Sequence, residues 1–238
     1  MCGTDMSLLL RARNRTWFAI VAATASLFGC EKSNEAEKPR EKPIPNETAK
    51  ADMLDPNVAK EIAEYVRSGF YDKERITEVF SEELYEPGEL DSNRLEVTID
   101  NEFVKWNAEK AAWPKITDCD RLDTAFLAIS KRGVVALQNA GYTQSDGYEE
   151  FLHVYSAAKD RASIAGYCFY HHQDLERAVR GEGLYLAFGP ANASDEDARG
   201  AEIGRIIREE LERAGLKVEW DGTFASRMRI TPLTWQKR

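Results

Sequence analysis

The stretch Gly166-Tyr-Cys-Phe-Tyr-His171 decides the fold class of this chain. It is apolar at successive positions, as is typical of a central strand that is covered on both faces of a sheet. Residues 184–188, Leu-Tyr-Leu-Ala-Phe, have the same character. Between the two runs lies a short predicted helix, 174–180, which Gly181 ends. Strands that alternate with helices in this way predict an α/β (α+β) fold, in which helices cover a sheet.

Further elements are predicted on both sides of these two strands. Apolar residues recur with helical spacing over 118–131, and a short apolar run at 134–137 predicts a strand. Helices are expected at 145–160 and 195–214, and strands at 216–220 and 228–233. The last two strands flank Asp221-Gly222, which predicts a β-hairpin at the end of the fold. The sheet is therefore expected to be mixed and to contain about five strands.

Residues 55–112 predict a helical section that precedes the sheet. Asp55-Pro56 is typical of a helix start, and Gly69 of a helix end. A second helix is predicted from residue 72 and a third over 92–113, although residues 97–99 could instead begin a strand. Residues 55–238 are thus expected to form one globular domain, with a helical section at 55–112 and a sheet core at 113–238.

The first thirty residues have the pattern of an export signal. Arg11, Arg13 and Arg15 precede an apolar run at 17–28. This run is shorter than the roughly 20 residues of a membrane-spanning helix. It ends in Leu27-Phe28-Gly29-Cys30, which resembles the lipobox of bacterial lipoproteins. The resemblance implies that residues 1–29 are a signal peptide and that Cys30 carries a lipid. An ordinary cleaved signal or an uncleaved anchor is the alternative.

Residues 30–54 are predicted to be a disordered, charged tether. They are rich in Glu, Lys, Asn and Pro and contain few large apolar side chains, so they cannot bury enough surface to fold. By the lipoprotein resemblance, Glu31 in place of an aspartate favours the outer membrane, facing the periplasm. The lipid on Cys30 would then hold the domain at the membrane, within reach of an envelope partner.

Charge and cysteine content restrict the function further. The formal net charge is −9, which argues against a nucleic-acid-binding protein. Removal of the signal would leave Cys119 and Cys168 besides the lipidated residue. An oxidising periplasm would permit a disulfide between them, whereas the apolar surroundings of Cys168 favour buried, inert thiols. No Cys-x-x-Cys pair exists, and no metal site or cofactor is expected.

Several segments of the second half occur together in one bacterial domain family. They are Trp113-Pro114 and residues 117–123, 166–176, 183–189, 215–222 and 229–230. From Trp113 onward the chain therefore resembles a bacterial domain family of unknown function. The resemblance implies an architecture but no established chemistry.

The segment from His171 to Glu176 is the best chemical candidate, because a strand there meets a helix. His171 and Asp174 could bind a metal or form a pair of base and orienting carboxylate, as in a hydrolase-type enzyme. In the structural alternative, His172 or Gln173 caps the helix and Asp174 complements its dipole. Adjacent strand residues point to opposite faces, so the two histidines cannot readily share an ion.

A second cluster, Asp118, Cys119 and Asp120, offers two carboxylates and a thiol. Cys119 as a nucleophile would need an imidazole such as His153 or His171. The same residues also fit a capping box between Thr117 and Asp120. Equivalent boxes are predicted at Thr143-x-x-Asp146 and Ser194-x-x-Asp197. Since the pattern recurs at three helix starts, capping is the favoured explanation.

The sequence as a whole predicts a non-enzymatic, membrane-anchored periplasmic lipoprotein that binds an envelope partner. The prediction depends on the anchor at Cys30, on the tether, and on the lack of a coherent catalytic set. The alternative is a hydrolase-type enzyme that uses a cleft containing His171 and Asp174, with Asp118 or Asp120 as a further carboxylate.

Overall fold

The structure is a computed structural model that describes residues 54–192, 194 and 196–238. These residues belong to one compact unit, Asp52–Arg238. The predicted signal peptide, Cys30 and nearly all of the predicted tether lie outside them. Leu54, the last residue assigned to the tether, is instead buried in the core of the helical section. Among the described helices, none is both long and apolar enough to cross a membrane.

The helical section consists of α2 (Pro56–Ser68), α3 (Lys73–Glu78) with its π-helical continuation η2 (Val79–Glu83), and α4 (Ser92–Lys110). The predicted boundaries hold, because the Asp55 carboxylate accepts a hydrogen bond from Asn57 N at 2.8 Å and Gly69 ends α2 with a φ of 75°. Residues 97–99 lie inside α4, so the alternative of a strand there is wrong. Ile62, Ile76 and Ile99 are fully buried between the three helices.

The second part of the domain is built on a five-stranded mixed sheet, which confirms the predicted fold class. Its strands are β1 (Val134–Leu137), β2 (Gly166–Phe169), β3 (Leu184–Pro190), β4 (Val218–Glu219) and β5 (Met228–Ile230). Their order is β1-β2-β3-β5-β4. Strands β1 and β2 are parallel, and the other neighbours are antiparallel. Strands β4 and β5 form the predicted terminal hairpin.

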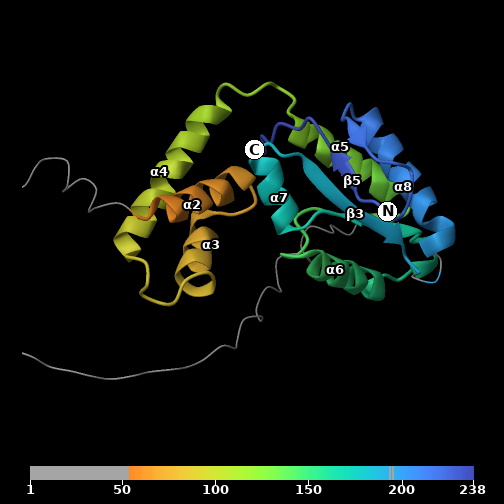
Figure 1. Ribbon diagram of the computed structural model, residues 1–238, viewed down its shortest axis with the longest axis horizontal. Coiled ribbons are helices and arrows are strands. Elements are labelled where there is room, and N and C mark those ends of the chain that lie inside the picture. Colours follow the sequence, from red (N-terminus) through yellow and green to blue (C-terminus); the bar gives the residue numbers. More distant parts are fainter. Residues whose placement is uncertain (1–53, 193, 195) are drawn as a thin grey trace, which may run out of the picture. The chain divides into compact units, whose positions relative to one another are not determined.

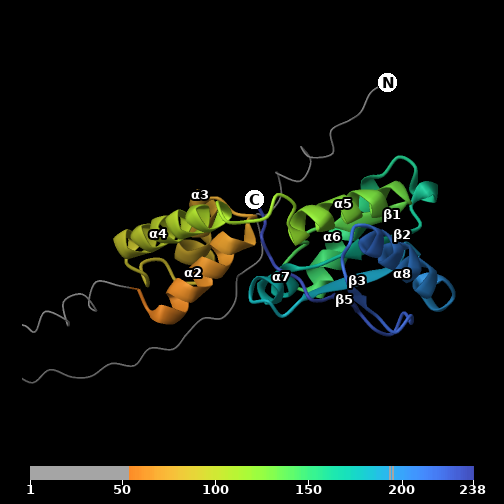
Figure 2. The same cartoon turned by 90° about the horizontal axis from the view of Figure 1, so that it is seen from above.

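Helices pack on both faces of the sheet (Figures 1 and 2). Helices α5 (Asp118–Lys131) and α8 (Glu196–Arg213) lie on one face, and α6 (Gln144–Ala157) lies on the other. The short helices η3 (Arg161–Ser163) and α7 (His172–Val179) precede and follow β2. On the α5 and α8 face, β3 contributes Leu184, Leu186 and Phe188 to the main core.

Alternation along β3 places Tyr185, Ala187 and Gly189 on the face that carries α6. Ala187 belongs to the small apolar cluster beneath α6, together with Phe151, Tyr167 and Phe169. Two of the three β3 residues on this face are therefore small. Tyr167 covers one of them, Gly189, where an added Cβ would lie 2.7 Å from Tyr167 Oη.

Candidate functional site

Helix α7 begins where the sequence predicts the best chemical candidate. His171 occupies the N-cap position and makes no side-chain capping hydrogen bond, and His172 is the first helical residue. The predicted capping by His172 or Gln173 is therefore wrong. Tertiary contacts override capping here: the His171 ring contacts Asp174, and the His172 ring contacts Tyr71.

The first imidazole belongs to a buried polar network. His171 Nε2 lies 2.9 Å from Asp174 Oδ2, so the structure brings the predicted pair together. Arg227 also donates to Asp174, through Nη1 to Oδ1 at 3.1 Å and through Nη2 to Oδ2. Only 5% of His171 and 1% of Asp174 are exposed. The carboxylate is therefore shared between two donors and is removed from solvent.

The network keeps Asp174 ionised. Burial disfavours the charged carboxylate, but hydrogen bonds from His171 and Arg227 and the charge of the guanidinium outweigh burial and lower the pKa of Asp174. The sequence gives no sign of Arg227, which lies 53 positions away in the chain. A carboxylate held in this way stabilises the fold and is poorly placed to exchange protons with a substrate.

The second imidazole turns toward the helical section. Tyr71 Oη lies 3.0 Å from His172 Nδ1 and accepts a hydrogen bond from Asn139 Nδ2 at 2.8 Å. Burial, together with the neighbouring His171, lowers the pKa of His172 to about 4. The ring is consequently neutral near pH 7.

Aromatic rings surround this imidazole. The ring centroids of Tyr65 and Tyr142 lie 4.8 and 5.5 Å from that of His172. Nε2 is buried and has no hydrogen-bond partner among the described residues, and Glu176 Oε1 lies 3.6 Å away. His172 therefore joins α7 to the helical section chiefly through ring packing and the contact with Tyr71. In the described part of the chain, no three His, Cys, Asp or Glu side chains are placed to hold a metal ion.

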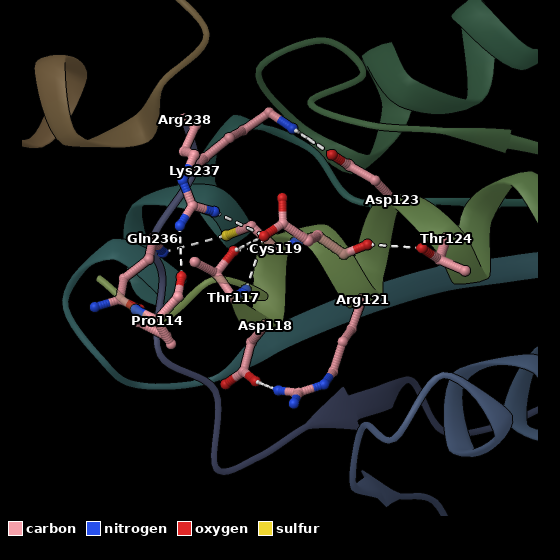
Figure 3. Close-up of polar contacts among 11 residues, drawn as sticks. Pro114, Thr117, Asp118, Cys119, Arg121, Asp123, Thr124, Gln236, Lys237 and Arg238 are labelled. Atoms are coloured by element: carbon pink, nitrogen blue, oxygen red, sulfur yellow. Dashed lines mark hydrogen bonds and ion pairs between the residues drawn. The ribbon is translucent and has the colours of Figure 1, made fainter. Parts of the chain in front are cut away.

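The second candidate cluster lies at the start of α5 (Figure 3). Thr117 Oγ1 accepts from Asp120 N at 3.2 Å, and Asp120 Oδ2 accepts from Thr117 N at 2.8 Å. The predicted capping box is therefore present, as is the box of Thr143 and Asp146 at the start of α6. The side chain of Asp197, in the third predicted box, lies outside the described residues.

The same cluster binds the segment 233–238 across the start of α5 (Figure 3). Asp118 accepts from Thr234 N at 3.0 Å, and Cys119 Sγ accepts from Gln236 N at 3.2 Å. Further along the segment, Lys237 pairs with Asp123 at 3.2 Å, and Arg238 pairs with Asp120 at 2.8 Å. The two predicted carboxylates, Asp118 and Asp120, thus hold two parts of the chain together.

Both cysteines are buried and free, so the structure does not contain the bridge considered between Cys119 and Cys168. Burial raises the pKa of Cys119 to about 12 and also raises the pKa of Cys168. A reactive cysteine needs the opposite shift, since the thiolate is the nucleophile. The hypothesis of a Cys119 nucleophile therefore has no support.

A groove lies on the sheet face that carries α6, and we call it the α6 groove. Its volume is about 690 Å³. Helix α6 forms one wall and the segment 224–227 forms the other, while Tyr167, Phe169 and Ala187 contribute to the floor. Arg227, the partner of Asp174, also lines it. The sequence missed this site because its walls come from separate parts of the chain.

Comparison with known proteins places the chain in a family. A family model described as Domain of unknown function (DUF6891) matches residues 51–238. No curated protein and no solved structure matches the chain. The matched region begins well before Trp113, where the sequence resemblance was expected to start, so it includes the helical section as well as the sheet. The chain therefore belongs to the DUF6891 family of domains of unknown function.

Proposed function

We propose that this protein is a lipoprotein held at the outer membrane through Cys30, and that its domain binds an envelope partner on the periplasmic side. The anchor is supported by the arrangement of Arg11 to Arg15, the apolar run 17–28 and Leu27-Phe28-Gly29-Cys30. The net charge of −9 suits a domain that stays dissolved beside an anionic membrane surface.

One observation favours binding over catalysis. Asp174, Asp118 and Asp120, the carboxylates that the sequence offers for catalysis, each accept hydrogen bonds that join separate parts of the fold. A hydrolase-type site would instead need an acid and a base that meet the substrate. The α6 groove is an open surface of the domain, and apart from Arg227 its lining residues take no part in these networks.

The anchor is tested by Cys30→Ser in a bacterial host with an outer membrane. The wild-type protein is expected in the membrane fraction, with Cys30 as its first residue and a lipid on that residue by mass spectrometry. The Cys30→Ser variant is expected to lose both properties. Cys2→Ser is the matched control, since it removes a nearby thiol outside the lipobox-like stretch. Unchanged mass and membrane association in Cys30→Ser would contradict the anchor.

The binding role is tested by cross-linking on intact cells, followed by purification. A partner at fixed stoichiometry is expected with the wild-type protein and is expected to be lost when Ala187→Leu fills the α6 groove. Lack of any stoichiometric partner, or equal recovery with both proteins, would contradict a binding role for this groove. The yield and circular dichroism of Ala187→Leu serve as the control for folding.

A further inference from the structure

The α6 groove has the size and surface of a small-molecule site. Its volume of about 690 Å³ lies within the range of roughly 300–1,000 Å³ that is usual for ligand pockets. Five of its thirteen lining residues are aromatic, and Tyr148, Tyr167 and Phe224 are among them. On β3, the small residue Ala187 contributes to its floor.

Positive charge is concentrated at one side of the groove. Arg177, Arg227 and Arg229, which we call the arginine cluster, surround the ring of Tyr185. Their guanidinium carbons lie 5.8, 5.7 and 5.6 Å from its centroid. The chain has a net charge of −9, so three neighbouring arginines stand out against an acidic protein.

Few carboxylates neutralise the cluster. Asp174 pairs with Arg227, and Glu219 lies 3.6 Å from Arg229 but is 65% exposed. Arg177 is exposed and has no ion-pair partner among the residues that the structure describes. Arg177 is therefore the member without an ion pair in the described chain, although Glu176 beside it in α7 interacts with its charge.

Arg227 also has unused hydrogen-bonding capacity. Its Nη atoms donate to Asp174 and to Tyr185 O, the latter at 3.2 Å. Its Nε is buried and has no hydrogen-bond partner in the described residues. An arginine carries five N–H donors, and an anionic acceptor forms stronger hydrogen bonds with it than a neutral one. The buried Nε is closed to a ligand, so besides pairing with Asp174 the residue offers its charge and its 30% exposed side chain at the groove wall.

We propose that the α6 groove binds a small organic anion whose aromatic or apolar body lies on the groove floor. Its carboxylate or similar group meets Arg227, with Arg177 and Arg229 supplying further attraction. The opposite wall carries Glu149, which is exposed and disfavours an anion on that side. The ligand therefore binds in one orientation, with its charge toward the segment 226–227 and its body between α6 and β3. This inference goes beyond the proposed function, because it adds a small-molecule ligand in the groove at which the partner is expected to bind.

The proposal is tested by isothermal titration calorimetry with two probes that share one aromatic body. The probes are 1-naphthoate, which is anionic, and 1-naphthamide, which is neutral. The full chain is titrated with each under the same buffer and salt. We expect naphthoate to bind about tenfold more tightly than naphthamide, because charge-assisted hydrogen bonds are roughly twice as strong as neutral ones.

Four variants separate the contribution of the aromatic body of the probe to its affinity from that of its negative charge. Ala187→Leu fills the floor and is expected to abolish binding of both probes. Arg177→Ala leaves the Asp174 pair intact and is expected to weaken naphthoate about threefold without changing naphthamide. Glu149→Gln is expected to strengthen naphthoate slightly. Arg208→Ala removes an exposed arginine from α8 and is the matched control, with no change expected for either probe.

Equal affinity for the two probes, or equal effects of Arg177→Ala and Arg208→Ala, would overturn the anion site. Failure of both probes to bind the wild-type protein would overturn it as well. None of these three results depends on the anchor or on a protein partner. If Cys30 is lipidated and a cross-linked partner is found while naphthoate does not bind, the proposed function stands and this inference fails. The reverse pattern would retain the site and reject the proposed function.

Discussion

Replacement of Arg227 by methionine should destabilise the domain strongly at neutral pH. The change leaves the Asp174 carboxylate buried, at 1% exposure, with His171 as its remaining side-chain partner. Removal of one member of a buried ion pair costs about 3–5 kcal/mol. The Arg227 side chain is itself 30% exposed, which places the expected loss near the lower end, at about 3 kcal/mol. Methionine retains much of the packing of the arginine stem.

The pH dependence of this loss identifies its cause. In the wild-type protein the pKa of Asp174 is lowered. The ionised carboxylate therefore stabilises the fold at pH values above its unfolded-state pKa of about 3.9. This stabilisation is lost as the pH falls through the pKa of the folded state. Without the guanidinium, burial dominates and the folded pKa rises above the unfolded one. The difference in unfolding free energy between wild type and Arg227→Met should therefore be largest near pH 7 and should shrink toward pH 4.

Urea unfolding monitored by circular dichroism measures both effects. Arg208→Met is the control, since its pair with Glu212 is exposed on both sides and is worth about 1 kcal/mol or less. Adding Asp174→Asn to Arg227→Met should recover part of the loss, because the buried charge is then absent. A loss of unfolding free energy below about 1 kcal/mol in Arg227→Met, or a loss that does not change with pH, would refute a stabilising buried pair of Arg227 and Asp174.

Three further predictions concern other parts of the domain. Trp235→Ala should lower the unfolding free energy by about 2 kcal/mol in urea titrations, because the half-buried indole links the segment 233–238 to the helical section; an effect below about 0.5 kcal/mol would contradict this link. Gly166→Ala should destabilise by about 3 kcal/mol or prevent folding, since its Cβ would lie 2.4 Å from a backbone oxygen of β3; a soluble variant with wild-type thermal stability would disprove the contact. Cys119 and Cys168 should resist a thiol reagent at about pH 8 until urea unfolds the domain, because burial raises the pKa of both thiols; rapid labelling of the native protein would exclude buried thiols.

Most elements of the fold could be predicted because their signals are local. The predicted helix 118–131 coincides with α5, and the capping box at Thr117 sets its start. Helix ends differ by up to three residues, as for the predicted helix 145–160, which is α6 at Gln144–Ala157. Strand ends differ as well, because pairing determines them. The predicted strand 216–220 is reduced to Val218–Glu219, since only these two residues pair with β5. Strand β3 instead extends past residue 188 to Pro190, because residues 189 and 190 pair with β2.

The candidate site was less predictable because its contacts join distant parts of the chain. The pairing of Asp174 with Arg227 leaves no mark on local periodicity, and neither does the contact of His172 with Tyr71, 101 positions earlier. The sequence did suggest that adjacent histidines would point in different directions. It could not identify their partners, and the prediction that one of them caps α7 failed for that reason.

The two networks at α7 together show which polar groups the fold requires. Asp174 with Arg227 fixes α7 against the segment before β5, and His172 with Tyr71 fixes α7 against the helical section. A buried polar group that stabilises the fold is expected to form all its hydrogen bonds within the protein, since an unpaired buried donor or acceptor lowers the stability. In these networks Arg227 Nε, His171 Nδ1 and His172 Nε2 depart from this expectation, because each is buried without a hydrogen-bond partner in the described residues. Of these three residues, Arg227 is the one that lines the α6 groove. The exposed Arg177 beside it is not needed for either network. The position of Arg227 in the groove lining, with Arg177 close to it around Tyr185, directs the search for a ligand to the α6 groove.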